Sequence, residues 1–400
     1  SEFVEDALVQ ALLTLGVKDG KADPALTKAL TDVELLRRAA AGRVVGQIDS
    51  TQHTAVRRLL DDAEPRVRFE AALGLARGGD KEAVPALIVL IAKGPMPLAW
   101  KAQEVLYRIA GDKSPPLPLT EDDGPKRAKV ADAWTGWWKD ASPTIELAKI
   151  SLDQALQGIN VICQEPSGAT PARVWACRAD GKPLWEIKDV MAWDARLLPN
   201  GHVLIAERSG YNRITERDTT GKILMEIAVT NTPGACQRLP NGNTFVATPS
   251  EILEVDPKGK TLWSHKDAGN EYVARAFRRS DGHIVYAAGG YKVVETDGDF
   301  QQLQAAEVTK TGDSWMSVEP LPGNRFLVAP YAAHKVMEID AAGKVLWECR
   351  SNTPMSAMRL PNGNTLVGSD RDRAVFEYDR SGKEVWKLQL ESGVRCARRY

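Results

Sequence analysis

The stretch AAGKVLW, at residues 341–347, decides the fold, because the chain repeats it with variations five more times. The other copies are ADGKPLW at 179–185, TTGKILM at 219–225, PKGKTLW at 257–263, TDGDFQQL at 296–303 and RSGKEVW at 380–386. The turn glycines Gly181, Gly221, Gly259, Gly298, Gly343 and Gly382 are 40, 38, 39, 45 and 39 residues apart. This spacing matches the length of a four-stranded blade, so the six repeats predict a six-bladed β-propeller.

Each repeat has a second turn upstream of this phrase, for example Pro361-Asn362-Gly363 in the last copy. Asn-Gly pairs tolerate positive φ and close tight hairpins, so these turns mark the ends of strands. The last repeat therefore predicts an inner strand at 356–360, a second strand at 364–369, a third at 375–379 and an outer strand at 384–388.

The two ends of the propeller region predict how the ring closes. Residues 394–399 lie one period after 356–360 and predict an inner strand with no later strands. Residues 160–163 and 173–180 predict the later strands of a blade that lacks its own inner strand. We therefore expect the last strand of the chain to complete the first blade, which removes open sheet edges.

The first 112 residues have a different period. Arg37 and Arg68 are 31 residues apart, as are Asp49 and Asp80. Helical patterns occur at 35–45, 53–60, 67–76, 83–91 and 98–109, with prolines near several helix starts. Two helices per repeat, with small alanines at packing positions, are typical of an α-solenoid of HEAT type.

The solenoid pattern begins in the middle of a repeat. A helix predicted at 6–15 matches the second helix of a repeat. The opening Ser1-Glu2-Phe3 resembles the short sequence that an expression vector leaves at the start of a chain. We expect the natural chain to extend upstream, where a further repeat would cover the end of this helix. The compartment stays open, because a signal peptide for export, for instance to the periplasm, would lie in that upstream segment.

We expect three regions: the solenoid at 4–112, a linker at 113–158 and the propeller at 159–400. The linker combines a loop rich in proline and charge with a helix that carries Trp134, Trp137 and Trp138. These indoles suit either a ligand platform or an apolar plug that joins the two domains. The plug is favoured, because a linker between large domains must bury surface to fix their angle.

Composition limits the partners. The 52 Lys and Arg residues balance the 53 Asp and Glu residues, so a broad electrostatic surface for nucleic acid is not expected. The sequence has no run of 18 apolar residues, and therefore predicts no transmembrane segment.

Five cysteines occur without CxxC spacing, which argues against zinc and thioredoxin-like sites. Three of them, Cys163, Cys177 and Cys396, fall on strands of the closing blade. One disulfide among these three is the alternative to the favoured interpretation, in which all five are small buried side chains. No metal site is predicted.

The propeller repeat resembles a known family. The pattern Val-x-Glu-x-Asp-x-x-Gly-Lys-x-x-Trp, at 336–347 and 375–386, resembles the repeat of PQQ-like β-propellers. HEAT repeats, a tryptophan-rich linker and six such blades together are similar to uncharacterised bacterial HEAT-repeat, PQQ-like propeller proteins. The resemblance covers nearly the whole chain and implies its fold, but no activity.

The resemblance does not extend to a PQQ cofactor. Quinoprotein dehydrogenases have eight blades, an adjacent cysteine pair and a calcium site, whereas this chain has six repeats and no adjacent cysteines. We therefore predict no cofactor. The outer-strand residues Trp185, Trp263, Trp347 and Trp386 are expected to pack between blades.

An enzymatic interpretation would need a histidine near the central channel, as in lyase-like or arylsulfotransferase-like propellers. His202 and His283 follow turns of the opposite rim, and His265 follows an outer strand. Only His334 lies on a loop that faces the same rim as the connections between blades. Because no partner for His334 is evident, no catalytic residue is predicted.

A ligand site would lie at one mouth of the channel, where the inner strands begin. The candidate residues there are Trp193, Asp194, Glu271, Arg275, Asp313, Trp315, His334 and Arg395. Such a mixture suits a peptide or a small polar ligand, and equally suits a solvated rim. We predict a non-enzymatic scaffold that binds protein or peptide partners through the solenoid surface and the propeller rim. The alternative is an enzyme or small-ligand-binding protein that acts at the channel mouth; the oligomeric state stays open.

Overall fold

The computed structural model describes two compact units, Ser1–Gly158 and Ile159–Tyr400. The described residues are 9, 12, 16–18, 20–117, 119, 120, 122–150, 152, 158–208, 210–266, 272–279, 281–308, 310–360 and 362–400. The helix predicted at 6–15 therefore lies outside the described residues except for Val9 and Leu12, and so does Glu271.

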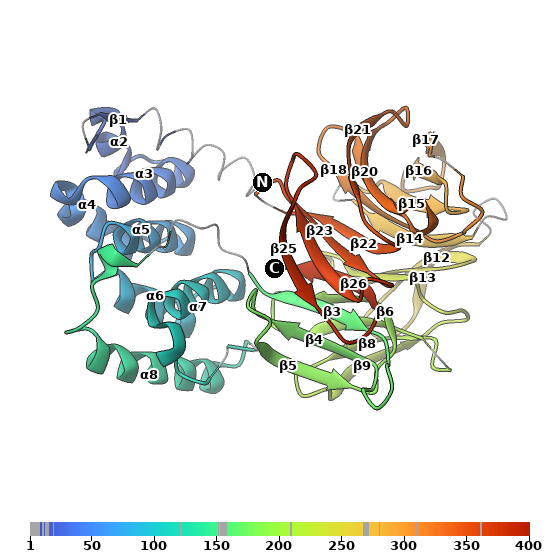
Figure 1. Cartoon of the computed structure of the whole chain (residues 1–400), viewed down its shortest axis with the longest axis horizontal. Coiled ribbons are helices and arrows are strands. Elements are labelled where there is room, and N and C mark those ends of the chain that lie inside the picture. The colour runs from blue at the N-terminus through green and yellow to red at the C-terminus, as the bar shows by residue number, and fades with distance from the viewer. Residues whose placement is uncertain are drawn as a thin grey trace. The chain divides into compact units, whose positions relative to one another are not determined.

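The first unit consists of helices after a short hairpin (Figure 1). The hairpin pairs β1 (Val17–Lys18) with β2 (Lys21–Ala22). The helices are α2 (Pro24–Ala29), α3 (Leu35–Ile48), α4 (His53–Arg57), α5 (Pro65–Arg77), α6 (Ala83–Lys93), α7 (Met96–Ala110) and α8 (Gly124–Ala141). The helix predicted at 53–60 is α4 followed by the 3₁₀ helix η2 (Arg58–Asp61); the other 3₁₀ helices are η1 (Ser50–Gln52), η3 (Gly111–Lys113) and η4 (Leu147–Lys149). Among the described residues, none of these helices is long and apolar enough to cross a membrane.

Small residues explain why α3 and α5 pack closely. A Cβ atom on Gly74 would lie 2.5 Å from the Arg43 carbonyl oxygen, and one on Gly46 would lie 2.9 Å from the Leu75 amide nitrogen. The two backbones are therefore in direct contact, which larger side chains would prevent.

The 31-residue period reflects a repeated turn. Asp49 Oδ1 accepts a hydrogen bond from the Thr51 amide at 3.1 Å, and Asp80 Oδ1 accepts one from the Glu82 amide at 3.1 Å. Asp80 also pairs with Arg57 at 2.8 Å. Aspartate recurs at this position because its carboxylate satisfies the free amides that begin the next helical turn.

The tryptophan-rich helix α8 packs mainly on α6 and also contacts α7 through Trp134. Trp134 is fully buried and packs edge-on against Tyr107, with the ring centroids 5.3 Å apart. Trp137 makes a similar contact with Trp134, also at 5.3 Å. Trp134 thus belongs to the core of the helical unit. That the three indoles also join the two units stays a prediction.

The second unit is a ring of six antiparallel four-stranded sheets, numbered here as blades 1 to 6 (Figure 1). Blade 1 contains β26 (Val394–Arg399), β3 (Asn160–Gln164), β4 (Arg173–Cys177) and β5 (Pro183–Lys188). Blade 2 contains β6 (Ala192–Leu197), β7 (Val203–Glu207), β8 (Arg213–Arg217) and β9 (Ile223–Ala228). Blade 3 contains β10 (Ala235–Arg238), β11 (Thr244–Thr248), β12 (Glu251–Val255) and β13 (Thr261–Lys266).

The remaining blades follow the same order. Blade 4 contains β14 (Val273–Arg278), β15 (Ile284–Ala288), β16 (Lys292–Thr296) and β17 (Gln302–Glu307). Blade 5 contains β18 (Met316–Leu321), β19 (Arg325–Pro330), β20 (Lys335–Asp340) and β21 (Val345–Arg350). Blade 6 contains β22 (Pro354–Arg359), β23 (Thr365–Ser369), β24 (Ala374–Tyr378) and β25 (Glu384–Gln389). The strands predicted for the last repeat agree with blade 6 to within two residues at each end.

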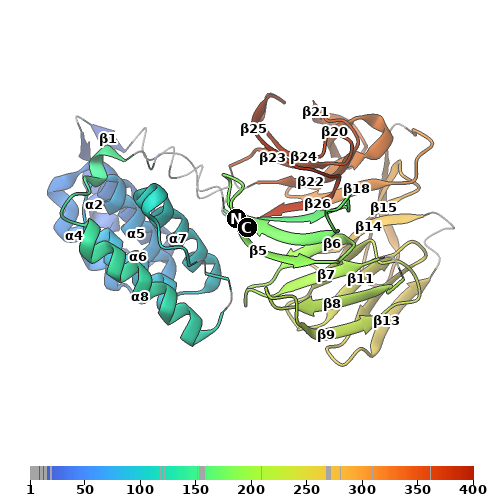
Figure 2. The ribbon, with the colours of Figure 1, turned by 60° about the horizontal axis from the view of Figure 1, so that its bottom comes forward.

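The predicted closure of the ring is confirmed. Strand β26, from the end of the chain, pairs antiparallel with β3 and supplies the inner strand of blade 1. Figure 2 shows this red strand beside the green strands of blade 1. We call the pairing of β26 with β3 the seam, because it joins the two ends of the propeller chain.

A contact repeated between neighbouring blades explains the repeat pattern. Arg359 of blade 6 donates to Glu338 of blade 5 at 2.7 Å, and its guanidinium lies 4.7 Å from the ring centroid of Trp347. Arg399 of blade 1 binds Glu377 and covers Trp386 of blade 6 in the same way. We call this arrangement the Glu-Arg-Trp clamp. These outer-strand tryptophans pack between blades, as expected.

Candidate functional site

One rim of the propeller gathers the candidate residues. Each second strand runs antiparallel to the inner strand, so its end lies where the inner strand begins. The residues that directly follow the second strands of blades 1 to 6 are Glu165, Arg208, Pro249, Gly289, Tyr331 and Asp370. We call this rim, together with Trp193, Trp315, Met355 and Arg395 at the starts of the inner strands, the mouth.

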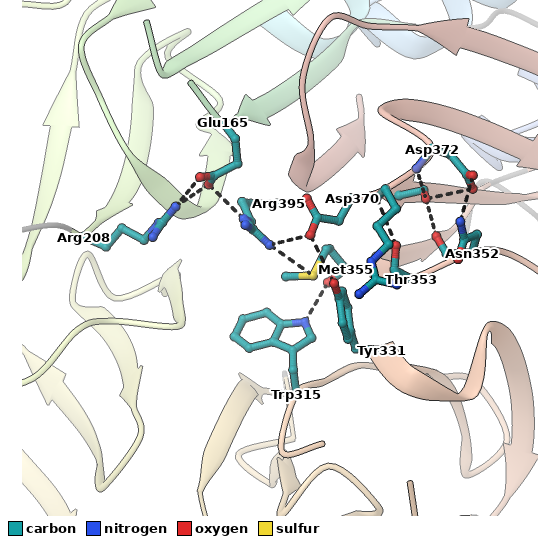
Figure 3. A network of polar contacts seen from close by, with 12 residues as sticks. Glu165, Arg208, Trp315, Tyr331, Asn352, Thr353, Met355, Asp370, Asp372 and Arg395 are labelled. Atoms are coloured by element: carbon teal, nitrogen blue, oxygen red, sulfur yellow. Dashed lines mark hydrogen bonds and ion pairs between the residues drawn. The ribbon is translucent and has the colours of Figure 1, made fainter. Parts of the chain in front are cut away.

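Ion pairs and a tyrosine hydrogen bond link four blades across the mouth (Figure 3). Arg395 Nε donates to Glu165 Oε1 at 2.8 Å, and Arg395 Nη1 donates to Asp370 Oδ2 at 3.2 Å. Glu165 also binds Arg208, and the Tyr331 hydroxyl donates to Asp370 at 3.3 Å. The four charged side chains are 15–20% exposed. The network is therefore electrically balanced, and its side chains are held in place at the surface.

Two tryptophans from opposite blades stack inside the mouth. Trp193 of blade 2 and Trp315 of blade 5 have ring centroids 4.5 Å apart and planes inclined by 27°. The guanidinium groups of Arg208 and Arg395 lie 4.8 Å and 5.2 Å from the centroid of Trp193. Trp315 Nε1 donates to the Met355 carbonyl oxygen at 3.3 Å, which fixes the indole.

The mouth is asymmetric. Blades 5, 6, 1 and 2 supply its aromatic and charged side chains. At the positions that correspond to Trp193 and Arg395, blades 3 and 4 have Gly234, directly before β10, and Ala274, the second residue of β14. Pro249 and Gly289 follow their second strands. The ion pairs and the tryptophan stack therefore lie on one side of the mouth, and Ala274 of blade 4 is buried in the same apolar cluster as Trp315.

A buried ion cluster supports the mouth from within the channel. Asp194, on β6, is fully buried and lies 3.2 Å from Arg275 Nη1 and 3.0 Å from Arg398 Nη2. Arg196 Nε lies 3.4 Å from the same carboxylate. Burial acts to raise the pKa of Asp194, but the nearby charges of Arg398, Arg275 and Arg196 outweigh it and hold the pKa far below its usual range.

The cluster also fixes the position of the tryptophan stack. Arg275 Nη2 donates to the Trp193 carbonyl oxygen at 2.8 Å, and its guanidinium lies 5.5 Å from the centroid of Trp315. Arg275 thus connects blade 4 to the Trp193 backbone and to the Trp315 ring, and shares the Asp194 carboxylate with Arg196 and Arg398.

A second carboxyl in the channel behaves differently. Burial raises the pKa of Glu319 to about 7, and the positive charges of Arg398, Arg196 and Arg359 only partly offset this effect. Its Oε2 atom is buried without a hydrogen-bond partner among the described residues. Glu319 therefore titrates near neutral pH.

Five of the predicted site residues come together at the mouth or directly beneath it: Trp193, Asp194, Arg275, Trp315 and Arg395. A sixth, Asp313, lies in the segment before β18, where its Oδ1 accepts a hydrogen bond from the Trp315 amide at 2.8 Å. Asp313 therefore orients the segment that carries Trp315. Glu271 lies outside the described residues.

His334 does not join this group. It precedes β20, the third strand of blade 5, and so lies two strands away from the channel-lining strand. Its backbone is left-handed, with φ of 52°, and its Nδ1 accepts a hydrogen bond from the Thr353 amide at 3.4 Å. It lines a separate hollow of about 440 Å³ with Arg350, Phe376 and Lys387, between blades 5 and 6.

The other described histidines of the propeller have structural partners. His202 pairs with Glu216 at 2.7 Å, and His283 pairs with Glu295 at 2.9 Å. His265 lies within β13 rather than after it, and its ring stacks on Phe300 at 3.8 Å. Within the described part of the chain, no three His, Cys, Asp or Glu side chains are grouped to hold a metal ion.

Sequence reasoning missed Glu165, Arg208, Tyr331 and Asp370. The signal that locates them is their position directly after the second strand of a blade. They were overlooked because the residue type at this position differs in every blade, so no repeated motif marks it.

Comparison with protein families supports the helical unit. The family model of HEAT repeats matches residues 23–107, and no curated protein matches the sequence. Among solved structures, a protein of unknown function from Bacteroides caccae is similar, with 16% identity, a TM-score of 0.49, and coverage of 60% of this chain and 98% of that chain. A catalytically inactive virginiamycin B lyase from Staphylococcus aureus with quinupristin is 11% identical, with a TM-score of 0.44 and coverage of 60% and 87%. The WD40 β-propeller domain of Doa1 is 13% identical, with a TM-score of 0.41 and coverage of 49% and 69%. The chain thus consists of a helical region with HEAT repeats, followed by a six-bladed β-propeller that its own last strand closes.

Proposed function

We propose that the chain is a non-enzymatic scaffold for protein partners and that the propeller mouth binds a peptide segment of one partner. HEAT repeats and propellers are both architectures that commonly bind proteins. The observation that supports the mouth as the binding surface is the grouping of aromatic and charged side chains on one side of it. That side presents Trp193, Arg208 and Arg395, and the tryptophan stack packs in one apolar cluster with the buried Ala274 of blade 4.

The chemistry of the mouth suits recognition of a peptide. Tryptophan and arginine are the residue types that dominate the energetics of protein interfaces. In the mouth, ion pairs with Glu165 and Asp370 hold Arg208 and Arg395 in place before a ligand arrives. Because these side chains are already ordered, binding costs less conformational entropy.

The alternative of an enzyme acting at the mouth has less support. Each described histidine of the propeller contacts a structural partner, and these partners are Glu216, Glu295, Phe300 and the Thr353 amide. His334, the candidate on the correct rim, lies at a third strand rather than at the channel. The relationship to bacterial PQQ-like propeller proteins, indicated by the repeat pattern, is part of our proposal.

The experiment is a selection of peptides from a random library on the full chain, followed by affinity measurements. Arg208→Ala should weaken the selected peptides about tenfold, or about 1.4 kcal/mol, because it removes a guanidinium from the Trp193 face. Arg178→Ala is the matched control, since Arg178 follows β4 on the opposite rim. Equal affinity for the wild type and both variants, or a library that yields no binder, would refute the mouth as a peptide site.

A further inference from the structure

Two cysteines face each other across the seam. Cys163 on β3 and Cys396 on β26 are directly opposite in the antiparallel register, and each is 1% exposed. Side chains of directly opposed residues point to the same face of a sheet. The two thiols are close enough to shift each other's pKa.

The backbone geometry of this pair suits a disulfide. Opposed residues in antiparallel strands have Cα atoms about 4.5–5.5 Å apart, and disulfides span Cα distances of about 4.4–6.8 Å. A bond therefore needs little movement of either strand.

The strand register also shows which of the cysteines can form a disulfide, a choice that the sequence alone did not make. Cys177 is opposite Asn160 on one side and Pro183 on the other. Cys349 is opposite Val336, and Cys236 lies against the Leu204 carbonyl oxygen. Cys163 and Cys396 are the pair that the strand register brings together.

We propose that Cys163 and Cys396 are a site of covalent modification, at which a disulfide fastens the propeller seam under oxidising conditions. A small-molecule disulfide such as oxidised glutathione serves as the oxidant. One protein thiolate attacks it and releases one reduced glutathione, and the second protein thiolate then displaces the other. The two cysteines lose two electrons and two protons in total, and two glutathione thiols carry them away.

Burial determines when this exchange takes place. Neither sulfur is accessible to glutathione in the closed ring, because each cysteine is 1% exposed. The reaction therefore occurs while β26 is undocked, either during folding or during a transient opening of the seam. Oxidation removes the hydrogen bond from Cys396 to Asp194, at 3.3 Å, but the arginines around Asp194 stay in place.

The bond would join residues 163 and 396, and so would enclose almost the whole propeller in one loop. Closing so long a loop reduces the entropy of the unfolded chain more than a short one does. We expect the melting temperature of the oxidised propeller to exceed that of the reduced form by on the order of 10 °C.

The test is to refold the full chain with oxidised glutathione or with dithiothreitol, and then to map peptides by mass spectrometry without reduction. A linked peptide pair containing Cys163 and Cys396, two hydrogens lighter than the sum of its reduced parts, is expected only after oxidation. The wild type and the control Cys177→Ala should melt higher when oxidised, and Cys396→Ala should not.

If Cys396→Ala fails to fold, the melting temperatures of Cys163→Ala and the peptide map of the wild type still test whether the disulfide forms. A wild type without this linkage after oxidation, or with a linkage that includes Cys177, would overturn the proposal. So would equal melting temperatures of the oxidised and reduced wild type. None of these outcomes depends on the proposed binding function.

Discussion

Replacing Asp194 by asparagine is expected to lower the melting temperature of the propeller by about 10 °C. The substitution keeps the shape of the side chain but removes its charge, which leaves Arg275 and Arg398 without their buried counter-ion. Breaking a buried ion pair costs about 3–5 kcal/mol, and each kcal/mol lowers the melting temperature of a domain of this size by about 2–4 °C.

Thermal unfolding of the full chain, followed by circular dichroism in the β-sheet region, measures this effect. Asp256→Asn is the matched control, because Asp256 lies in an exposed turn and accepts hydrogen bonds that an asparagine oxygen also accepts. The pKa of Asp194 is lowered in the folded protein, so its contribution is present above the unfolded pKa, near 4, and is lost below it. The difference between the variant and the wild type should therefore be constant between about pH 5 and pH 8 and shrink in acid. A variant that melts within about 2 °C of the wild type at neutral pH would refute the reasoning.

Four further outcomes are expected. Because the folded pKa of Glu319 is raised to about 7, the wild type should lose stability as the pH rises from about 4.5 to about 7, and Glu319→Gln should lack this dependence; identical pH profiles of the melting temperature would contradict the assignment. Deleting residues 392–400 removes β26 and should cause aggregation or a sharply lower melting temperature, whereas a truncated protein that melts like the parent would show that the seam is dispensable. Arg399→Met leaves the buried Glu377 unpaired and should cost about 3 kcal/mol in denaturant unfolding, whereas Arg380→Met, at a side chain 46% exposed, should cost much less. Trp134→Ala should destabilise the helical unit by about 3–5 kcal/mol, visible in the helical circular dichroism signal, with Trp138→Ala as a milder control.

The blades could be predicted because their turns use the same chemistry in each repeat. Gly343 has a φ of 84°, and a Cβ atom on it would lie 2.7 Å from the Glu307 carbonyl oxygen of the preceding blade. Asp340 Oδ1 accepts the Ala342 and Lys344 amides, both at 2.9 Å, and closes the same turn. Such constraints are local, and therefore leave a visible pattern of residue types.

The site could be predicted only in part, because its residues meet through space and not through a repeat. Trp193 and Arg395 were found since each lies where an inner strand begins. Glu165 and Asp370 were missed, although they hold Arg395, because nothing local marks them. His334 was placed correctly on the loop between the second and third strands, but the third strand lies two strands from the channel, so this loop does not reach the mouth.

The Glu-Arg-Trp clamp has a consequence for how the ring arose. Blade 6 offers Arg359 to the preceding blade and Glu377 and Trp386 to the following one, so the two sides of this blade are complementary to each other. When a gene segment encoding such a blade is duplicated in tandem, the copy fits beside its parent with contacts that already exist. Growth by duplication then needs no new interface until the ring is full, and the curvature of the blades sets the number at which the first and last copies meet.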